Sequence, residues 1–285
     1  MVDGPLSKLK IGAVVQARMG STRLPDKVMM PIPGPDGPTL LGRICAQLNR
    51  SERITDIIIA TTSNPIDDKI EEFTTQSGIP CFRGDENNVF ERYQKVSQLH
   101  DLDIVIRVTG DNPIIDTSLL DETIRAHQDQ NNHYTRSTGL PIGMNFEIIS
   151  GEAFKSINAE ALTQEEQEHV TLCFKNHPRA RVHEFQTPSL IKNIRLTIDY
   201  PADIAMFSLL FAFCKKTVSL KTLNQVAVAH PWIFKINQGL YQKRTFKNTE
   251  EEIDCALQIL AHFGMKQSAD IFIQLLQKSP YKSFE

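Results

Sequence analysis

The first half of the chain alternates short apolar runs with longer stretches of helical periodicity. The apolar runs, most of them rich in β-branched residues, occupy residues 11–15, 57–60, 81–82 and 104–108. Helical patterns cover residues 40–49, 66–76, 89–99 and 118–126. Strands that alternate with helices in this order predict βαβ units, and therefore a three-layer αβα fold around a mostly parallel sheet.

The second half is less regular up to residue 244 and helical after it. Strand-like runs lie at residues 133–138, 144–149, 182–186 and 194–198. Helical patterns cover residues 164–175, 201–213, 248–263 and a last stretch to about 276. Pro201 suits the first turn of its helix, and Gly264 separates the last two helices. We therefore predict an α/β domain over residues 1–244 and a helical C-terminal extension over residues 245–285.

Composition narrows the class of protein without naming it. Hydrophobic residues make up 41% and charged residues 23% of the 285 positions, which is typical of a soluble globular protein. The net charge of −3 gives no general attraction to nucleic acid or to an anionic membrane, and no apolar run is long enough to span a bilayer. The five cysteines are scattered and lack zinc-ligand spacing, so we expect reduced thiols and a cytoplasmic protein.

The loop after the first predicted strand, residues 16–27, has the composition of a polyphosphate site. Gly20 lets the backbone come close to a ligand, and Arg18, Arg23 and Lys27 can neutralise phosphate charge. Ligands of open α/β sheets usually bind at such strand-end loops, although a solvated basic loop is the simpler alternative. The segment matches neither the GxxxxGK[ST] nor the GxGxxG phosphate-binding motif, so neither mechanism transfers.

Two carboxylates follow later strand-like runs. Asp111 ends the run at residues 104–108 and would lie at the same sheet edge as the basic loop. Magnesium takes one or two carboxylates together with phosphate oxygens, so Asp111 is a candidate Mg²⁺ ligand, the alternative being a helix cap or salt-bridge partner. Asp199 precedes the helix that Pro201 opens, where it could instead be a plain N-cap. We interpret Asp203, in the first turn of that helix, as compensating the helix dipole.

Three segments together resemble a known family. Residues 16–27 resemble the "ARxGSxRxPxK" loop, residues 109–113 the "TGDxP" element and residues 195–203 the "RLTVDxPED" element of the cytidylyltransferases that make CMP-activated sugar acids. The match is closest to the branch typified by spore coat polysaccharide biosynthesis protein F, and it extends over about residues 10–235. Weaker similarity covers residues 83–93 ("RGxxxDVLxRY"), 143–147 ("GLDVE") and 165–171 ("xEREHVT").

The resemblance implies a Rossmann-like nucleotide-diphospho-sugar transferase fold and a Mg²⁺-dependent reaction. In that reaction CTP and a small sugar or sugar acid give a CMP-sugar and pyrophosphate, for surface polysaccharide or glycan biosynthesis. It also implies that Asp199 is a second metal ligand beside Asp111. Relatives are often dimers, so a homodimer is the assembly that the resemblance implies.

The family's functional residues map onto definite positions of this chain. The implied catalytic residues are Arg18, Lys27, Asp111 and Asp199. The implied nucleotide-binding residues are Gln16, Ala17, Arg18, Met19, Gly20, Ser21, Arg23, Lys27, Arg83, Asp85, Thr109 and Gly110. The implied sugar-binding residues are Asn145, Glu147, Glu168 and His169. A structural role remains the alternative for Arg83 and His169.

The chain departs from the family's pattern at three charged positions. Asn88 and Asn145 stand where the family has aspartate, and Gln167 stands where it has arginine. The change at Asn145 lies in the element expected near the sugar, so it predicts a different sugar or a weaker activity. At a fourth, uncharged position, Asn112 replaces a frequent cysteine.

Other functions are compatible with parts of this pattern. A glycosyltransferase of similar fold usually holds its metal with Asp-x-Asp at a strand end, whereas residues 101–103 precede a strand and would lie at the opposite edge. A nucleotidyltransferase that uses UTP, GTP or dTTP would carry the same residues. A non-catalytic sugar-nucleotide-binding module would explain the lost charges but not the retained Asp111, Asp199 and Lys27.

Overall fold

The computed structural model describes residues 9–175, 177, 179–214, 218–240 and 248–278. The chain divides into two compact units, Met1–Gly239 and Leu240–Glu285. The boundary expected between residues 244 and 245 falls within residues 241–247, which lie outside the described part.

The first unit is built on a seven-stranded sheet with the order β3-β2-β1-β4-β6-β5-β7. Its strands are β1 (Ile11–Gln16), β2 (Asp56–Thr62), β3 (Cys81–Gly84), β4 (Ile104–Thr109), β5 (Tyr134–Thr138), β6 (Glu147–Ser150) and β7 (Val182–Gln186). All neighbouring pairs are parallel except the two that involve β6. The predicted mostly parallel α/β sheet is therefore confirmed.

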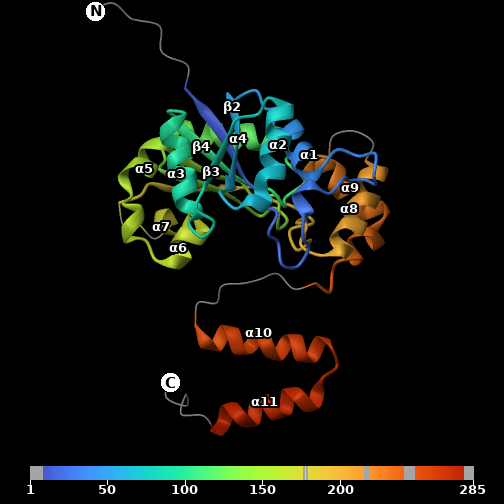
Figure 1. Ribbon diagram of the computed structural model, residues 1–285. Coiled ribbons are helices and arrows are strands. Elements are labelled where there is room, and N and C mark those ends of the chain that lie inside the picture. The colour runs from blue at the N-terminus through green and yellow to red at the C-terminus, as the bar shows by residue number, and fades with distance from the viewer. Residues whose placement is uncertain (1–8, 176, 178, 215–217, 241–247, 279–285) are drawn as a thin grey trace, which may run out of the picture. The chain divides into compact units, whose positions relative to one another are not determined.

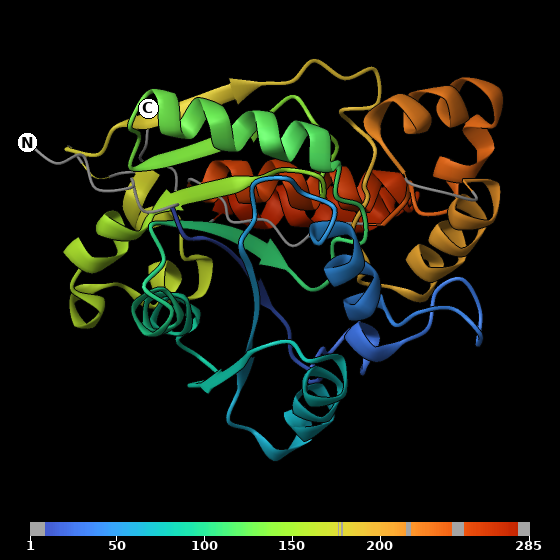
Figure 2. The ribbon, with the colours of Figure 1, turned by 90° about the horizontal axis from the view of Figure 1, so that it is seen from above.

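Helices cover both faces of the sheet and confirm the three-layer arrangement (Figure 1). One face carries α1 (Leu40–Leu48), α2 (Asp68–Ser77), α4 (Thr117–Asp129), α8 (Pro201–Phe213) and α9 (Leu220–Ala229). The other face carries α3 (Val89–Leu99), α5 (Gly151–Ser156) and α7 (Leu172–Lys175), and α6 (Gln164–His169) packs against α3. Short 3-10 turns lie at Lys27–Met29, Pro65–Asp67, Ala159–Ala161 and Pro231–Lys235. Seen from above in Figure 2, the strands pass between α3 on one side and α1 on the other.

The apolar run of β1 is explained by burial on both faces. Ala13 and Val15 belong to the core under α1, whereas Val14 belongs to the core under α3. Successive side chains of a strand point to opposite faces, so a central parallel strand between two helical layers has to be apolar at every position. Gly12 leaves room for a neighbouring core side chain, because a Cβ atom there would lie 2.4 Å from a methyl carbon of Leu102.

Two sequence expectations are wrong in detail. Residues 194–198 form no strand but an extended segment with a single bridge, between Ile142 and Arg195. Leu196 and Ile198 are fully buried there, so their apolar character reflects core packing rather than sheet pairing. The helix expected over residues 164–175 is broken in two at Val170, which has φ 51 and ψ −49.

That break is a γ-turn stabilised by its surroundings. The N–H of Thr171 donates to the carbonyl of His169, across Val170. A γ-turn with positive φ is rare and strained, above all for a β-branched residue. Val170 is fully buried against α3 and α7, which compensates for the strain.

The second unit is a pair of helices. α10 (Thr249–His262) begins at Asn248, whose side chain accepts from the N–H of Glu251 at 2.9 Å, and Gly264 at φ 69 separates it from α11 (Lys266–Lys278). Both helices of the predicted extension are therefore present. Within the described ranges, no helix is both long and apolar enough to cross a membrane.

Candidate active site

The first two predicted loops leave the sheet side by side. β1 and β4 pair in parallel with Gln16 opposite Thr109, and the N–H of Gly110 donates to the carbonyl of Gln16 at 2.8 Å. A Cβ atom at Gly110 would lie 2.9 Å from that same oxygen, so only glycine lets the two loops approach this closely. The basic loop and Asp111 therefore share the carboxyl edge of the sheet, as predicted.

The third segment is attached to these loops through its backbone. The N–H of Ile198 donates to the carbonyl of Asp111 at 2.9 Å, and the N–H of Leu196 donates to that of Ile142 at 2.7 Å. Gly143 has φ 94, and a Cβ atom there would lie 2.1 Å from the Leu196 carbonyl oxygen. These contacts bring Asp199 beside Asp111, although the two residues lie 88 positions apart in the sequence.

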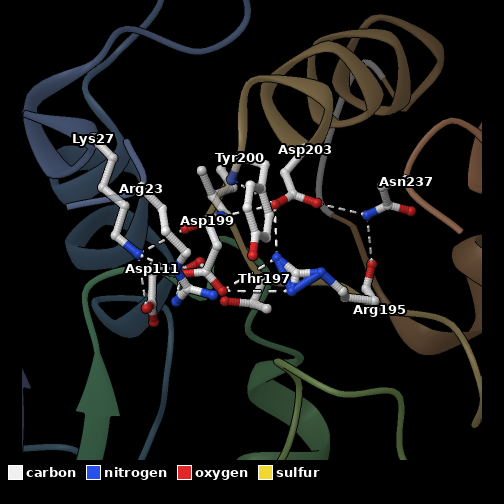
Figure 3. Close-up of polar contacts among 10 residues, drawn as sticks. Arg23, Lys27, Asp111, Arg195, Thr197, Asp199, Tyr200, Asp203 and Asn237 are labelled. Carbon is white, nitrogen blue, oxygen red and sulfur yellow. Dashed lines mark hydrogen bonds and ion pairs between the residues drawn. The ribbon is translucent and has the colours of Figure 1, made fainter. Parts of the chain in front are cut away.

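Four of the predicted residues meet at this point. The Lys27 Nζ donates to Asp111 Oδ2 at 3.0 Å, to Asp199 Oδ1 at 2.9 Å and to the Ile198 carbonyl at 2.8 Å. Arg23 Nη2 donates to Asp199 Oδ1 at 2.8 Å. Figure 3 shows both basic side chains reaching from the first loop toward the two carboxylates.

A further set of buried residues lies behind Asp199. Arg195 Nη2 is 3.2 Å from Asp199 Oδ2 and 2.7 Å from Asp203 Oδ2. Asp203 also accepts from the N–H groups of Asp199 and Tyr200, at 2.8 and 2.9 Å. Asn237 Nδ2 donates to Asp203 Oδ1 at 2.8 Å. This network fixes the backbone and side chain of Asp199 from behind (Figure 3).

Asp203 therefore does more than compensate a helix dipole. It is fully buried, it accepts from the N–H groups of the two residues that precede α8, and it neutralises Arg195. The N-cap alternative for Asp199 is not what the structure has, because the oxygens of Asp199 are bonded to Lys27, Arg23 and Arg195. Sequence reasoning gave no role to Asn237, which lies outside all the recognised motifs.

These acidic and basic side chains form one balanced group, which we call the Asp111–Asp199 cluster: Arg23, Lys27, Asp111, Arg195, Asp199 and Asp203. Burial alone would raise the pKa of Asp111, but the Lys27 ammonium beside it holds that pKa below its usual range. The Asp111 and Asp199 side chains differ in access, being 31% and 3% exposed. The cluster is therefore approached from the side of Asp111.

The donor set of the cluster fits a magnesium ion. Asp111 and Asp199 stand close enough for one ammonium group to bridge them. Among the described residues, no group of three or more His, Cys, Asp or Glu side chains could hold a metal alone. Magnesium commonly takes only one or two carboxylates and completes its shell with phosphate oxygens and water.

The start of the basic loop is fixed, while its tip is exposed. Ala17 and Met19 are buried, and the N–H of Met19 donates to Asp67 Oδ1 at 2.7 Å. Asp67 is itself buried and was not recognised from the sequence. Arg18 is exposed, and its guanidinium lies 3.4 Å from the Glu86 carboxylate. Gly20 is also exposed, and Ser21 is half-buried.

Arg83 and Asp85 have local partners. Arg83 Nη1 is 2.7 Å from Asp68 Oδ1 and 2.7 Å from Glu71 Oε2, both on α2. Asp85 accepts from the N–H groups of Asn87 and Asn88 at 2.7 and 3.0 Å. Nucleotide contact by Arg83 and Asp85 therefore stays a prediction.

Glu147 lies in a second polar group, the Glu147 cluster, with Arg107, Tyr134, Thr171 and Lys175. Arg107 Nη1 is 2.6 Å, Thr171 Oγ1 2.8 Å and Lys175 Nζ 3.2 Å from its carboxylate, which also accepts from the Tyr134 hydroxyl. Burial alone would raise the pKa of Glu147, but Arg107, Lys175 and the two hydroxyls lower it to about 2.

A cavity of about 50 Å³ lies beside the Glu147 cluster, along β4 and the loop before β6. Its polar lining residues are Arg107, Thr109, Asn112, Asn145 and Glu147. The structure thus brings Asn145 and Glu147 together with Thr109. Glu168 and His169, by contrast, lie in the last turn of α6, exposed and half-buried respectively.

Comparisons with known proteins identify the family of the chain. The sequence model of the family described as Cytidylyltransferase matches residues 13–253, and the chain belongs to that family. The resemblance drawn from the motifs is thereby confirmed.

Individual relatives point the same way. Over 206 residues the chain is 36% identical to "Spore coat polysaccharide biosynthesis protein SpsF" of Bacillus subtilis (strain 168), covering 70% of this chain and 85% of that protein. A structure of a cytidylyltransferase from Leptospira borgpetersenii superposes with a TM-score of 0.74 at 29% identity, covering 82% of this chain and all of that one.

A more distant solved structure supports the fold alone. It is CMP:2-keto-3-deoxy-manno-octonic acid synthetase complexed with CTP, with a TM-score of 0.55 at 15% identity, covering 72% of this chain and 99% of the other.

Proposed function

We propose that the protein transfers a cytidylyl group from CTP to a sugar or sugar acid, giving a CMP-sugar and pyrophosphate for surface polysaccharide or glycan biosynthesis. The observation that carries the proposal is the Asp111–Asp199 cluster, which joins two carboxylates to the basic loop at the carboxyl edge of the sheet. Membership of the cytidylyltransferase family and similarity to a protein named for spore coat polysaccharide biosynthesis support it.

Charge neutralisation and positioning are what this reaction requires of a protein. A sugar oxygen attacks the α-phosphorus in line while pyrophosphate leaves, and no covalent intermediate with the protein is needed. In this proposal Arg18 and Arg23 hold the β- and γ-phosphates, since a guanidinium group can donate two hydrogen bonds to one phosphate. Both side chains extend from a loop whose backbone is fixed at Met19. Lys27 adds a third positive charge at the same place.

Asp111 and Asp199 are the ligands of Mg²⁺ in this proposal. When bound, Mg²⁺ supplies polarisation of the α-phosphate and neutralises charge that develops on the phosphate oxygens. Arg195 and Asp203 keep Asp199 in one orientation, and Asn237 holds Asp203. These three are positioning residues.

The base and the sugar lie on either side of this centre. The side-chain oxygen of Gln16 is buried and has no hydrogen-bond partner among the described residues, so it can accept from the amino group of a cytosine. Asn145 and Thr109 line the cavity. Asn145 is a proposed sugar contact, together with Glu168 and His169 of α6, and Thr109 is a proposed nucleotide contact. Glu147 acts there mainly by holding Arg107 and Lys175 in place.

The test is pyrophosphate release from CTP, UTP, GTP and dTTP, each with Mg²⁺ and a panel of sugar acids and neutral sugars. We expect release with CTP, and a loss of roughly 10³-fold in Asp111→Asn. Asp101→Asn is the matched control, since Asp101 is an exposed carboxylate whose backbone conformation suits asparagine. Full activity of Asp111→Asn would refute the assigned role of the cluster.

If CTP binds but no pyrophosphate is released with any nucleotide and sugar, the non-catalytic module would be favoured instead. Sugar transfer from a nucleotide sugar without pyrophosphate release would favour the glycosyltransferase.

We further propose a cytoplasmic homodimer. The five cysteines, all unpaired with one another, agree with a reducing compartment.

A further inference from the structure

The ammonium group of Lys27 occupies the place between the two proposed metal ligands. It contacts Asp111 Oδ2 and Asp199 Oδ1 at 3.0 and 2.9 Å, and the Lys27 side chain is only 9% exposed. A divalent cation that bound both carboxylates would need the same oxygens and much of the same space. Lys27 and the metal therefore compete for one position.

We propose that Lys27 is a placeholder for the metal ion: in the nucleotide-free protein its ammonium neutralises Asp111 and Asp199, and a divalent cation binds there only when Lys27 withdraws. This inference rests on the proposed function, in which a triphosphate lies beside the cluster and offers Lys27 a new anionic partner. Metal and nucleotide consequently bind together, and the metal alone binds weakly.

The structure distinguishes Lys27 from the other cations around Asp199. Arg195 is 8% exposed, contacts Asp199 and Asp203 from behind, and belongs to the same buried segment. Lys27 instead comes from the first loop and reaches the solvent-accessible carboxylate of Asp111. When Lys27 leaves, Arg23 and Arg195 still neutralise Asp199, so withdrawal does not leave that carboxylate unpaired.

The chemistry of lysine and the position of Lys27 in the chain allow its side chain to change partners. Lysine is a compact point charge on a flexible four-carbon stem, so it can exchange one set of anionic partners for another. Lys27 is the first residue of a three-residue 3-10 turn, after Asp26 at φ 58, and not part of a long helix or a strand. Its third hydrogen bond, to the Ile198 carbonyl at 2.8 Å, is the neutral contact that withdrawal gives up.

The first experiment measures Mn²⁺ binding to the nucleotide-free full-length chain by calorimetry, for wild type and Lys27→Met. Removing the competing ammonium while keeping the length of the side chain should tighten Mn²⁺ binding about tenfold or more. Mn²⁺ should also raise the melting temperature of Lys27→Met more than that of wild type. Lys69→Met is the matched control, because Lys69 is exposed and its ion pair is with Asp26, outside the Asp111–Asp199 cluster. Equal Mn²⁺ affinity in wild type and Lys27→Met would overturn the inference.

A second measurement uses only the wild-type chain, in case Lys27→Met folds poorly. Lysine acetylation is followed by mass spectrometry with no addition, with saturating Mn²⁺, and with Mn²⁺ and CTP. Lys27 should be protected at first and become several-fold more reactive with Mn²⁺ alone, while Lys69 stays constant. Unchanged protection of Lys27 when Mn²⁺ is bound would refute displacement.

Neither Mn²⁺ affinity nor lysine acetylation depends on turnover. The placeholder role of Lys27 and the proposed function can therefore be refuted independently. Pyrophosphate release from CTP together with equal Mn²⁺ affinity in both proteins would refute the placeholder and keep the proposed function. Tighter Mn²⁺ binding by Lys27→Met, without pyrophosphate release from any nucleotide, would support the placeholder and refute the proposed function.

Discussion

The two carboxylate clusters of this protein are built from different parts of the fold. In the Glu147 cluster the carboxylate lies on β6, and Arg107 and Tyr134 come from the neighbouring strands β4 and β5. In the Asp111–Asp199 cluster the carboxylates follow the sheet edge, and Arg23 and Lys27 come from a loop. The comparison indicates that donors held by regular elements fix a structure, whereas donors supplied by a loop can be exchanged for a ligand.

The sharpest test of this comparison is Glu147→Gln. Removing the charge leaves the half-buried Arg107 and Lys175 without their anionic partner, so the free energy of unfolding should fall by about 3 kcal/mol. Urea denaturation measures the change. Glu184→Gln is the control, because the Glu184–Arg136 pair is exposed and contributes about 1 kcal/mol or less. Equal losses in the two variants would contradict a structural role for the Glu147 cluster.

The same carboxylate predicts a dependence on pH. Its folded pKa of about 2 lies below the ordinary value of 4.5, so its ionisation stabilises the fold above pH 4.5. This stabilisation is lost as the pH falls toward 2, by about 2 kcal/mol between pH 5 and pH 3.

Unfolding free energies of wild type and Glu147→Gln at these two pH values isolate the effect. Buried His127, whose pKa burial lowers to about 4, titrates in both proteins and cancels in the comparison. The difference in unfolding free energy between wild type and Glu147→Gln should be smaller at pH 3 than at pH 5. An equal difference at the two pH values would argue against the lowered pKa of Glu147.

Asn237→Ala tests the support behind Asp199. It removes the donor to Asp203 Oδ1 and to the Arg195 carbonyl, both of them buried, and should cost about 1–2 kcal/mol of unfolding free energy. If Asn237 also positions Asp199, kcat should fall several-fold with little change in KM for CTP. The exposed Asn49 supplies the control substitution Asn49→Ala. A loss of stability with unchanged kcat would leave Asn237 a structural residue only.

The smallest effect is expected for Arg83→Ala. Its partners Asp68 and Glu71 are more than half exposed, and surface ion pairs contribute about 1 kcal/mol or less. Since these pairs occupy the guanidinium, KM for CTP should change by about threefold or less, whereas Arg18→Ala should raise it about tenfold. A larger rise of KM in Arg83→Ala would place Arg83 at the nucleotide after all.

The sequence determined the sheet layers and the approximate position of the site. Apolar runs at β1 and β4, separated by helical periodicity, sufficed for a parallel sheet, because hydrophobic period and strand length are local properties. The motifs around Lys27, Asp111 and Asp199 located a candidate site at the carboxyl edge, since parallel strands end together.

Only the tertiary structure decided which partners these side chains have. Residues 194–198 have the composition of a strand but are buried against the loops of Asp111 and Ile142, because a β-branched run is equally favourable in either environment. The Lys27 bridge and the Asn237–Asp203 contact join segments far apart in the chain. Pairing at such separations depends on the packing of whole elements, which no local pattern of residues encodes.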